Sequence, residues 1–182
     1  GLRAHLKART AVGGAWLLFG DRTQEHDAFF DAELQAWLAS GALKRLDRGD
    51  CAGAIGDFNV AIERRPDHVP LWNSRGYALQ KLGRIDEAIA DFDRCIAMKE
   101  DYEAAWYNRG NARKEKREYA AAIADFNQAL KLDPNHAEVY VQRGLAKKAQ
   151  GDLQAAIDDY TRAIGKNDRL FDTNLFYKNT QE

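Results

Sequence analysis

The segments W-Y-N-R-G-N-A, Trp106 to Ala112, and A-I-A-D-F, Ala122 to Phe126, decide the fold, because both recur at an interval of 34 residues. In the first segment the recurring rows are Trp72, Trp106 and Tyr140, then Arg75, Arg109 and Arg143, then Gly76, Gly110 and Gly144. In the second they are Ala54, Ala88, Ala122 and Ala156, then Asp57, Asp91, Asp125 and Asp159, then Phe58, Phe92, Phe126 and Tyr160. Such a fixed interval indicates a stack of identical structural repeats.

Each repeat is predicted to be a pair of helices. Within one repeat the first helix covers about Val69 to Leu82 and the second covers about Asp86 to Met98, because the apolar residues of each recur at helical spacing. Polar residues just before the first helices are expected to cap them, and these are Asp67, Asp101 and Asn135. Residues at the turn between the two helices are expected to end the first helix, and these are Gly83, Arg117 and Gly151.

Small residues are expected to let the helices approach closely. The glycine row leaves a gap on each first helix, and the alanine row leaves the facing gap on each second helix. The aromatic residues are expected to fill the space between neighbouring repeats. An aspartate follows each arginine of the row by 16 residues, as Asp91 follows Arg75. We therefore expect each arginine to pair within its own repeat or with a neighbouring one, which would leave none for a phosphate or an acidic peptide.

The patterns W-N-S-R-G-Y-A, W-Y-N-R-G-N-A and Y-V-Q-R-G-L-A, together with the A-I-A-D-F segments, resemble the tetratricopeptide repeat family. The resemblance implies an all-α helical-hairpin solenoid, a right-handed superhelix, with repeats at 35–68, 69–102, 103–136 and 137–170. The first repeat departs from the pattern, with Leu38 in the aromatic row and Ala42 in the glycine row. The apolar tail at 171–182 is expected either to cap the last helix or to leave a patch through which copies associate.

The same resemblance implies a non-catalytic scaffold that binds a peptide or a partner protein's surface in a concave groove of first helices. Residues of these helices that vary between repeats are free to choose the partner, and they are Asn73, Ser74, Tyr77, Lys81, Tyr107, Asn108, Asn111, Lys114, Val141, Gln142, Leu145 and Lys148. A subtype of the family holds the C-terminal carboxylate of chaperones with basic residues and asparagines. Asn108 matches one such asparagine, but Glu138 and Gln142 stand where cations are needed, so binding of chaperone tails is not predicted.

Residues 1–48 lack the interval of 34. Gly14 to Arg22 is predicted to be a buried strand, and Asp27 to Ser40 an amphipathic helix. The pieces W-L-L-F-G-D-R and H-D-A-F-F-D-A-E-L-Q-A-W resemble the NADP-binding lobe of sulfite reductase flavoproteins and related diflavin reductases. The resemblance implies that Gly20, Asp21 and Arg22 lie near the cofactor phosphates.

This second resemblance leaves an alternative function, a fragment of an NADPH-dependent flavoprotein reductase. The glycine-rich turn and the segment that reads the cofactor's extra phosphate are absent, so we expect residues 1–34 to be an inactive remnant. The two contexts conflict at Leu43 to Asp47, where the reductase has a strand and the repeat has a helix. We expect a helix from about Asp31 to Arg48, since its residues are good helix formers and the next repeat offers a surface.

Composition narrows the function further. The 182 residues include 27 lysines and arginines against 28 aspartates and glutamates, and no apolar run long enough for a membrane span, so neither a nucleic acid nor a membrane partner is predicted. Two cysteines are too few for a disulfide framework and favour a reducing, cytoplasmic location. Cys95 is predicted to be a core residue and Cys51 a surface thiol, with no base to make either a nucleophile. The histidines share no metal-ligand spacing, and His68 and His136 are expected to be exposed at turns, so no catalytic site, metal or cofactor is predicted.

Overall fold

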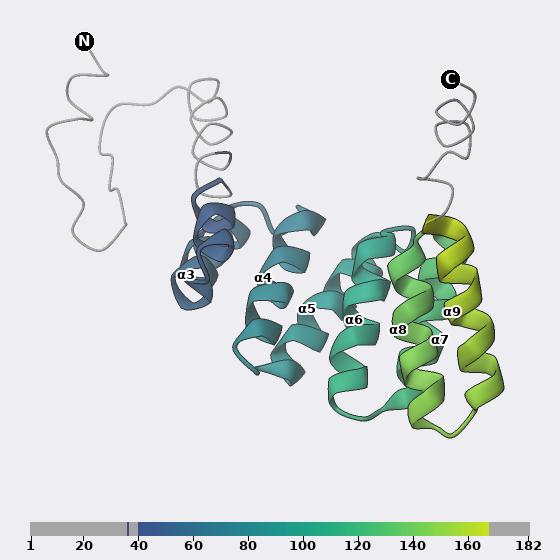
Figure 1. The fold of residues 1–182 in the computed structure, drawn as a ribbon. Coiled ribbons are helices and arrows are strands. Elements are labelled where there is room, and N and C mark those ends of the chain that lie inside the picture. The colour runs from purple at the N-terminus through teal and green to yellow at the C-terminus, as the bar shows by residue number, and fades with distance from the viewer. Residues whose placement is uncertain (1–35, 37–39, 168–182) are drawn as a thin grey trace, which may run out of the picture. The chain divides into compact units, whose positions relative to one another are not determined.

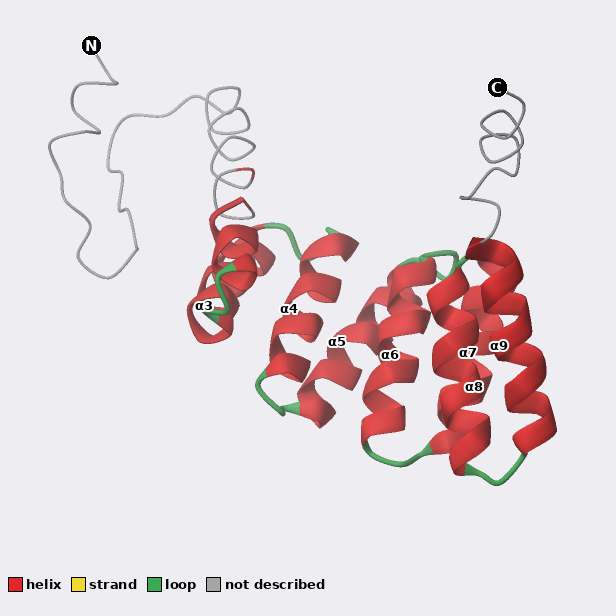
Figure 2. Cartoon of the chain, in the orientation of Figure 1, coloured by secondary structure: helices red, strands yellow, loops and turns green. Residues whose placement is uncertain are grey.

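The computed structural model describes residue 36 and residues 40–167, all of which belong to the compact part of the chain that begins at Gln35. Every regular element among these described residues is an α-helix (Figure 2). Residues 40–47 are helical, so the predicted helix is confirmed over Leu43 to Asp47. The predicted strand at 14–22, most of the predicted helix at 27–40 and the tail at 171–182 lie outside the described residues.

Seven further helices follow residues 40–47 and are arranged as consecutive antiparallel hairpins (Figure 1). They are α3 (Cys51–Arg64), α4 (Val69–Lys81), α5 (Ile85–Met98), α6 (Glu103–Glu115), α7 (Tyr119–Leu132), α8 (Ala137–Ala149) and α9 (Leu153–Asn167). The hairpins are α4 with α5, α6 with α7, and α8 with α9, and each second helix packs on the first helix that follows it. The first helices α4, α6 and α8 also contact one another in order. The predicted all-α hairpin array is confirmed.

The turn inside each hairpin has one backbone geometry. Gly83 adopts a φ of 75°, a conformation that glycine enters without steric cost, and the amide of Arg84 donates to the carbonyl of Leu79 at 3.0 Å. Gly151 and Arg117 take the same conformation at the other two turns, as predicted. The helix at 40–47 ends in this way too, because Gly49 has a φ of 80°. Residues 40–47 therefore correspond to the first helices of the later hairpins.

The predicted side-chain caps are wrong. The first helix α4 begins at Val69, where it was predicted to begin. The residues directly before α4, α6 and α8 are His68, Tyr102 and His136, and none of them caps with its side chain. The row of Trp72, Trp106 and Tyr140 holds the loop before each first helix instead. Trp72 Nε1 donates to the backbone carbonyl of Pro66 at 2.9 Å. Trp106 and Tyr140 donate in the same way to Glu100 and Pro134.

The glycine row faces an aromatic ring of its own hairpin. A Cβ placed on Gly110 would lie 2.7 Å from Cε1 of Phe126, closer than real contacts allow. Gly76 has the same relation to Phe92, and Gly144 to Tyr160. The expectation that the rings fill only the space between repeats is therefore corrected. Each ring fills the gap left by the glycine of its own hairpin, and Phe92 and Phe126 also belong to clusters that include residues of the next hairpin.

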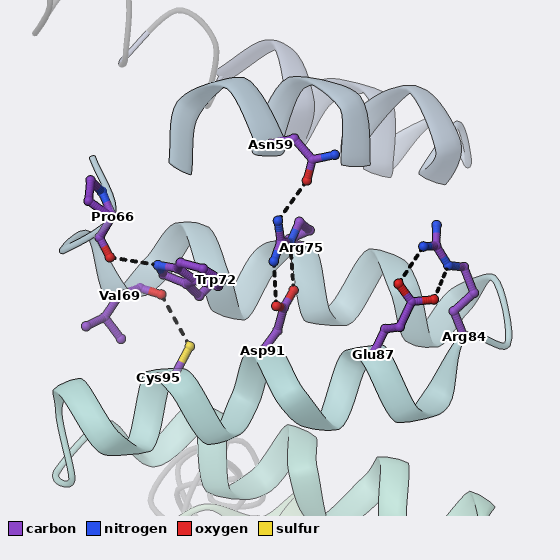
Figure 3. A network of polar contacts seen from close by, with 9 residues as sticks. All are labelled: Asn59, Pro66, Val69, Trp72, Arg75, Arg84, Glu87, Asp91 and Cys95. Carbon is purple, nitrogen blue, oxygen red and sulfur yellow. Dashed lines mark hydrogen bonds and ion pairs between the residues drawn. The ribbon is translucent and has the colours of Figure 1, made fainter. Parts of the chain in front are cut away.

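Each arginine of the row ties three helices together. The guanidinium of Arg75 on α4 donates to both carboxylate oxygens of Asp91 on α5, at 2.8 and 2.6 Å. Its third nitrogen donates to Oδ1 of Asn59 on α3, at 2.8 Å (Figure 3). The face of the Trp72 ring lies 4.8 Å from the guanidinium carbon, within cation–π range. The two pairings left open by the sequence, within the repeat and with its neighbour, thus both occur.

We call this group of an arginine, the aspartate that it pairs with and the aromatic ring beneath it a knot. The same knot recurs in the next two hairpins. Arg109 pairs with Asp125 at 3.1 and 2.7 Å and with Asp93 of the preceding hairpin at 2.5 Å. Arg143 pairs with Asp159 and donates to the preceding hairpin's Asn127. A two-pronged bond between arginine and carboxylate fixes both partners in orientation, so each knot sets the angle within a hairpin and its register with the one before.

The knots differ in how much positive charge they hold. Asp125 forms a second ion pair with Arg113, and Asp159 forms one with Lys147, each at 2.8 Å. In the hairpin of α4 and α5 the residue at the matching position is the uncharged Leu79. The first repeat has Gly41 in the arginine row, and its aspartate, Asp57, pairs with Arg45 instead. The number of cations that pair with the aspartate therefore rises from one at Asp91 to two at Asp125 and Asp159.

Glycine-to-alanine changes test the packing. We predict that Gly110→Ala lowers the free energy of unfolding by about 1–3 kcal/mol, because the added methyl group overlaps the buried ring of Phe126. The matched control is Gly165→Ala in α9, where nothing lies within 4 Å of the added Cβ and the better helix former is neutral or stabilising. Urea unfolding followed by circular dichroism measures both. Equal stability of the two variants would contradict the packing.

The pH dependence of stability tests the knots. Burial alone would raise the pKa of Asp159, but hydrogen bonds from Arg143 and Lys147 outweigh it and hold the pKa below its ordinary value. A carboxyl with a depressed pKa stabilises the fold above its unfolded pKa of about 4 and loses that contribution as the pH falls through the lower, folded value. We therefore predict that Asp159→Asn costs about 3–5 kcal/mol at pH 7 and loses less further stability on acidification than the parent does.

Its control is Asp158→Asn, an exposed neighbour bonded only to Gln154 in the described part of the chain. Urea unfolding of all three proteins, repeated at steps from pH 7 to pH 3, measures both the cost and the slope. If Asp159→Asn and Asp158→Asn followed the same curve, the carboxylate of Asp159 would not be held by its cations.

Candidate functional site

All twelve residues predicted to choose a partner lie on the first helices α4, α6 and α8. None of them is buried: Tyr77, Lys81, Leu145 and Lys148 are exposed, and the other eight are half-buried. We call the surface formed by these twelve side chains the first-helix face. Since α4 contacts α6 and α6 contacts α8, the three rows of side chains form one continuous surface.

Between α4 and α6 polar side chains of the face and of its edge join the two helices. Asn108 Nδ2 donates to Asn73 Oδ1 at 3.0 Å, and Gln80 Nε2 donates to Glu115 Oε1 at 2.5 Å. An amide side chain has two donors and an acceptor with two lone pairs, so the pair of asparagines retains donors on Asn73 and the acceptor on Asn108. The pair can therefore hold the peptide groups of another chain while still joining the two helices.

The two tyrosines of the face are held differently. Tyr77 is exposed, and the ammonium of Lys81 lies 5.0 Å from the centre of its ring. Tyr107 is half-buried between the rings of Phe126 and His136, whose centres lie 6.3 and 5.2 Å away. Burial raises the pKa of Tyr107. Tyr107 is therefore part of the packing, whereas Tyr77 is 41% exposed, with Lys81 over its ring.

Between α6 and α8 a lysine bridges the helices. Lys114 Nζ donates to the side-chain oxygen of Gln142, and Gln142 donates in turn to Glu138. Burial lowers the pKa of Lys114, since loss of water disfavours the charged form. The α8 row itself is less polar, because Val141 and Leu145 replace the asparagine and tyrosine that α4 has at these positions. The face thus gains two apolar side chains, Val141 and Leu145, at its α8 end.

A hollow of about 550 Å³ at the N-terminal ends of α6 and α8 was missed by the sequence reasoning. Its lining residues are Glu103, Asp133, Asn135, His136, Ala137, Glu138, Val141 and Lys166. His136 Nδ1 lies 2.9 Å from Glu103 Oε1, and His136 is half-buried, so the prediction that it is an exposed turn residue is wrong. The signal was Glu103 itself, a charged residue in a row that otherwise holds Val69 and Ala137.

The remaining predicted residues give no catalytic arrangement within the described residues. Cys95 is fully buried, its thiol lies 3.4 Å from the carbonyl of Val69, and burial raises its pKa to about 12, as suits a core residue. Cys51 is half-buried at the start of α3. Over residues 40–167 no group of His, Cys, Asp and Glu has the geometry to hold a metal ion. Gly20, Asp21 and Arg22 lie outside the described residues.

No helix in the described part of the chain is both long and apolar enough to cross a membrane.

Two regions of the chain resemble known proteins in sequence. A sequence model of the tetratricopeptide repeat matches residues 69–102 and 103–136, and a second model of this repeat matches residues 126–158. A stretch of 39 residues is 54% identical to the sulfite reductase [NADPH] flavoprotein alpha-component of Vibrio cholerae, and 51% identical to that of Vibrio parahaemolyticus. This stretch is 21% of the chain and only 6% of the flavoprotein's length.

Solved structures resemble the array in fold. A crystal structure of MamA has a TM-score of 0.70 at 20% identity, over 80% of this chain and 85% of MamA. The first repeat domain of Spaghetti (RPAP3), bound to an HSP90 peptide, has a TM-score of 0.63 at 23% identity, over 65% of this chain and 94% of that domain. The repeat domain of Arabidopsis OM64 has a TM-score of 0.62 at 22% identity, over 65% of this chain and 98% of the domain. The repeated knots, the hairpin turns and the family matches agree, and the helical array over residues 69–158 belongs to the tetratricopeptide repeat family.

Proposed function

We propose that the protein is a non-catalytic scaffold and that its first-helix face binds a peptide or a surface segment of a partner protein. The observation that carries the proposal is the separation of roles within each first helix. The recurring residues, such as Arg109 and Gly110, are consumed by packing and by the knots. The varying residues gather on one continuous surface and none is buried.

The chemistry of the face indicates what the partner offers. The remaining donors and acceptor of Asn73 and Asn108 suit the backbone of an extended segment, because each peptide group presents one donor and one acceptor. The exposed ring of Tyr77 offers contact area with a polar tip. At the other end, Val141 and Leu145 offer an apolar contact. We therefore infer an extended segment with an apolar side chain at the α8 end.

The related structures support binding of this kind, since the Spaghetti repeat domain holds a peptide. The near balance of charge, with a net formal charge of −1, argues against a nucleic acid as the partner. Both cysteines are free thiols, which favours a reducing compartment such as the cytoplasm.

Two leucines that are exposed to the same degree, one on the first-helix face and one outside it, test whether this face binds peptides. A phage-displayed library of random linear peptides is selected on the full chain, and the affinity of each selected peptide is measured by fluorescence anisotropy. We predict that Leu145→Ala weakens binding about tenfold or more, because Leu145 supplies the apolar contact at the α8 end of the face.

The control is Leu132→Ala on α7, because Leu132 is 40% exposed and Leu145 is 42% exposed, but only Leu145 belongs to the first-helix face. The control variant should bind within about twofold of the parent. Binding that survives Leu145→Ala and Tyr77→Ala together would place the peptide elsewhere and overturn the proposal.

A reductase fragment remains the second candidate, favoured by the 39-residue identity to the flavoprotein. We propose that this stretch retains no cofactor site, because it amounts to only 6% of that protein's length. Isothermal titration of the full chain with NADPH is predicted to give no saturable heat at micromolar concentrations. Saturable binding that is lost in Arg22→Ala would favour the reductase alternative.

A further inference from the structure

The hollow at the N-terminal ends of α6 and α8 carries an excess of negative charge. Its lining holds three carboxylates, Glu103, Asp133 and Glu138, against one ammonium group, that of Lys166. Its volume of about 550 Å³ is large enough for an organic group, since pockets that hold such groups measure roughly 300–1,000 Å³. The hollow can therefore admit a ligand, and the charge of its walls favours a cation.

Two of the carboxylates are bonded only to uncharged groups or to a histidine. Glu103 Oε1 lies 2.9 Å from His136 Nδ1, and Asp133 Oδ1 accepts from the backbone amide of Asn135 at 2.9 Å. In the part of the chain that the structure describes, neither carboxylate forms an ion pair with a lysine or an arginine. Their negative charge is thus available to a cation from outside the chain.

The third carboxylate and the one ammonium of the hollow are also not matched to each other. Glu138 accepts from the side-chain amide of Gln142, and the nearby Lys114 reaches it only through that same amide. Lys166 Nζ donates at 2.8 Å to the side-chain oxygen of Asn135, which is uncharged. The lysine therefore lowers the negative potential of the hollow without neutralising any one carboxylate.

The repeat does not require these carboxylates. One repeat earlier, the positions of Glu103, Asp133 and Glu138 hold other residue types, namely Val69, Lys99 and Ala104. The three acidic side chains are therefore free to serve recognition, in the same way as the varying residues of the first-helix face.

The arrangement of the groups indicates which cation fits. Over residues 40–167 no group of His, Cys, Asp and Glu has the geometry of a metal site, so the carboxylates of the hollow are too dispersed to surround one ion. A guanidinium has five N–H donors in one plane and is more weakly hydrated than an ammonium, so it can address separate acceptors at once. Ala137 and Val141 offer apolar contact to the methylene groups of an arginine side chain.

The hollow adjoins the first-helix face. Val141 belongs to both, and Gln142 of the face holds Glu138 of the hollow. We propose that the hollow binds an arginine side chain of the segment that lies on the first-helix face. This inference rests on the proposed function and adds a charged residue to the partner, beside the apolar side chain that contacts the α8 end.

Peptides selected on the full chain, and weakened by Leu145→Ala, test the arginine. Each peptide is synthesised with arginine and with citrulline, which has a similar shape but no charge. We expect the selected peptides to be enriched in arginine, and we expect citrulline to weaken binding to the parent about fivefold or more, because it removes the charge that the carboxylates attract. In Glu138→Gln, citrulline should cost less than about twofold, because the carboxylate is then already lost.

The matched control is Glu63→Gln on α3, which removes the same charge at an exposed position on a helix that does not contact α8. This variant should keep the full preference for arginine over citrulline. Selected peptides without arginine, or a cost of citrulline in Glu138→Gln equal to that in the parent, would overturn the proposal.

A small probe separates this inference from the proposed function. The full chain is titrated with Nα-acetyl-arginine amide and with Nα-acetyl-citrulline amide while its backbone amides are followed by NMR. The arginine probe alone should shift the signals of His136, Glu138 and Val141, with at least threefold weaker affinity in Glu138→Gln. Binding of this probe without any peptide that depends on Leu145 would contradict the proposed function and still support the arginine site. Equal shifts with both probes, or none with either, would overturn the arginine site whatever the peptides show.

Discussion

The array depends on the knot of arginine, aspartate and aromatic ring that recurs in each hairpin from α4 to α9. In the hairpin of α6 and α7, Asp125 is buried and would be costly to place there without partners. Arg109 meets it with two hydrogen bonds, rests on Trp106 at 4.7 Å and reaches Asp93 of the hairpin before. One side chain thus sets both the closure of its hairpin and the position of the preceding one. An array of hairpins needs both constraints, because no hairpin buries its apolar face alone.

The recurring rows made most of the fold predictable. A row is a statement about packing, so the close approach of helices at Gly110 and an ion pair for Arg75, within its repeat or with a neighbour, could be inferred before any coordinates. That the ring of Phe126 fills the gap at Gly110 was not inferred. The loops were less predictable because the chain has more than one way to satisfy a helix end. Asp67 is a good cap by residue type, but the helix begins at Val69 and the loop is closed by Trp72, which bonds to a backbone carbonyl that no sequence pattern reveals.

The candidate site divides in the same way. Its proposed location on the first helices followed from the family resemblance. The rows then selected its residues, because a residue that varies within a constant frame is not needed for the frame. Its chemistry did not follow. Tyr107 is held by Phe126 and His136, whereas Tyr77 is exposed. This difference depends on side-chain directions, which the sequence alone does not specify. The hollow beside His136 was missed for a related reason, since it is lined by side chains from three helices and from the loop before α8, which no single helical period brings together.

The unequal charge of the knots has a consequence for how the array opens. Asp125 and Asp159 each hold two cations, whereas Asp91 binds one arginine and Asp57 binds Arg45 at a partly exposed site. In a linear array each hairpin is stabilised mainly by its neighbours, so the weaker knots let one end open before the other. The N-terminal hairpins would then unfold and refold while α6 to α9 remain intact. A partner that spans α4 to α8 would reduce this difference in stability between the two ends. Part of its binding free energy would then be used to hold the weaker end in place.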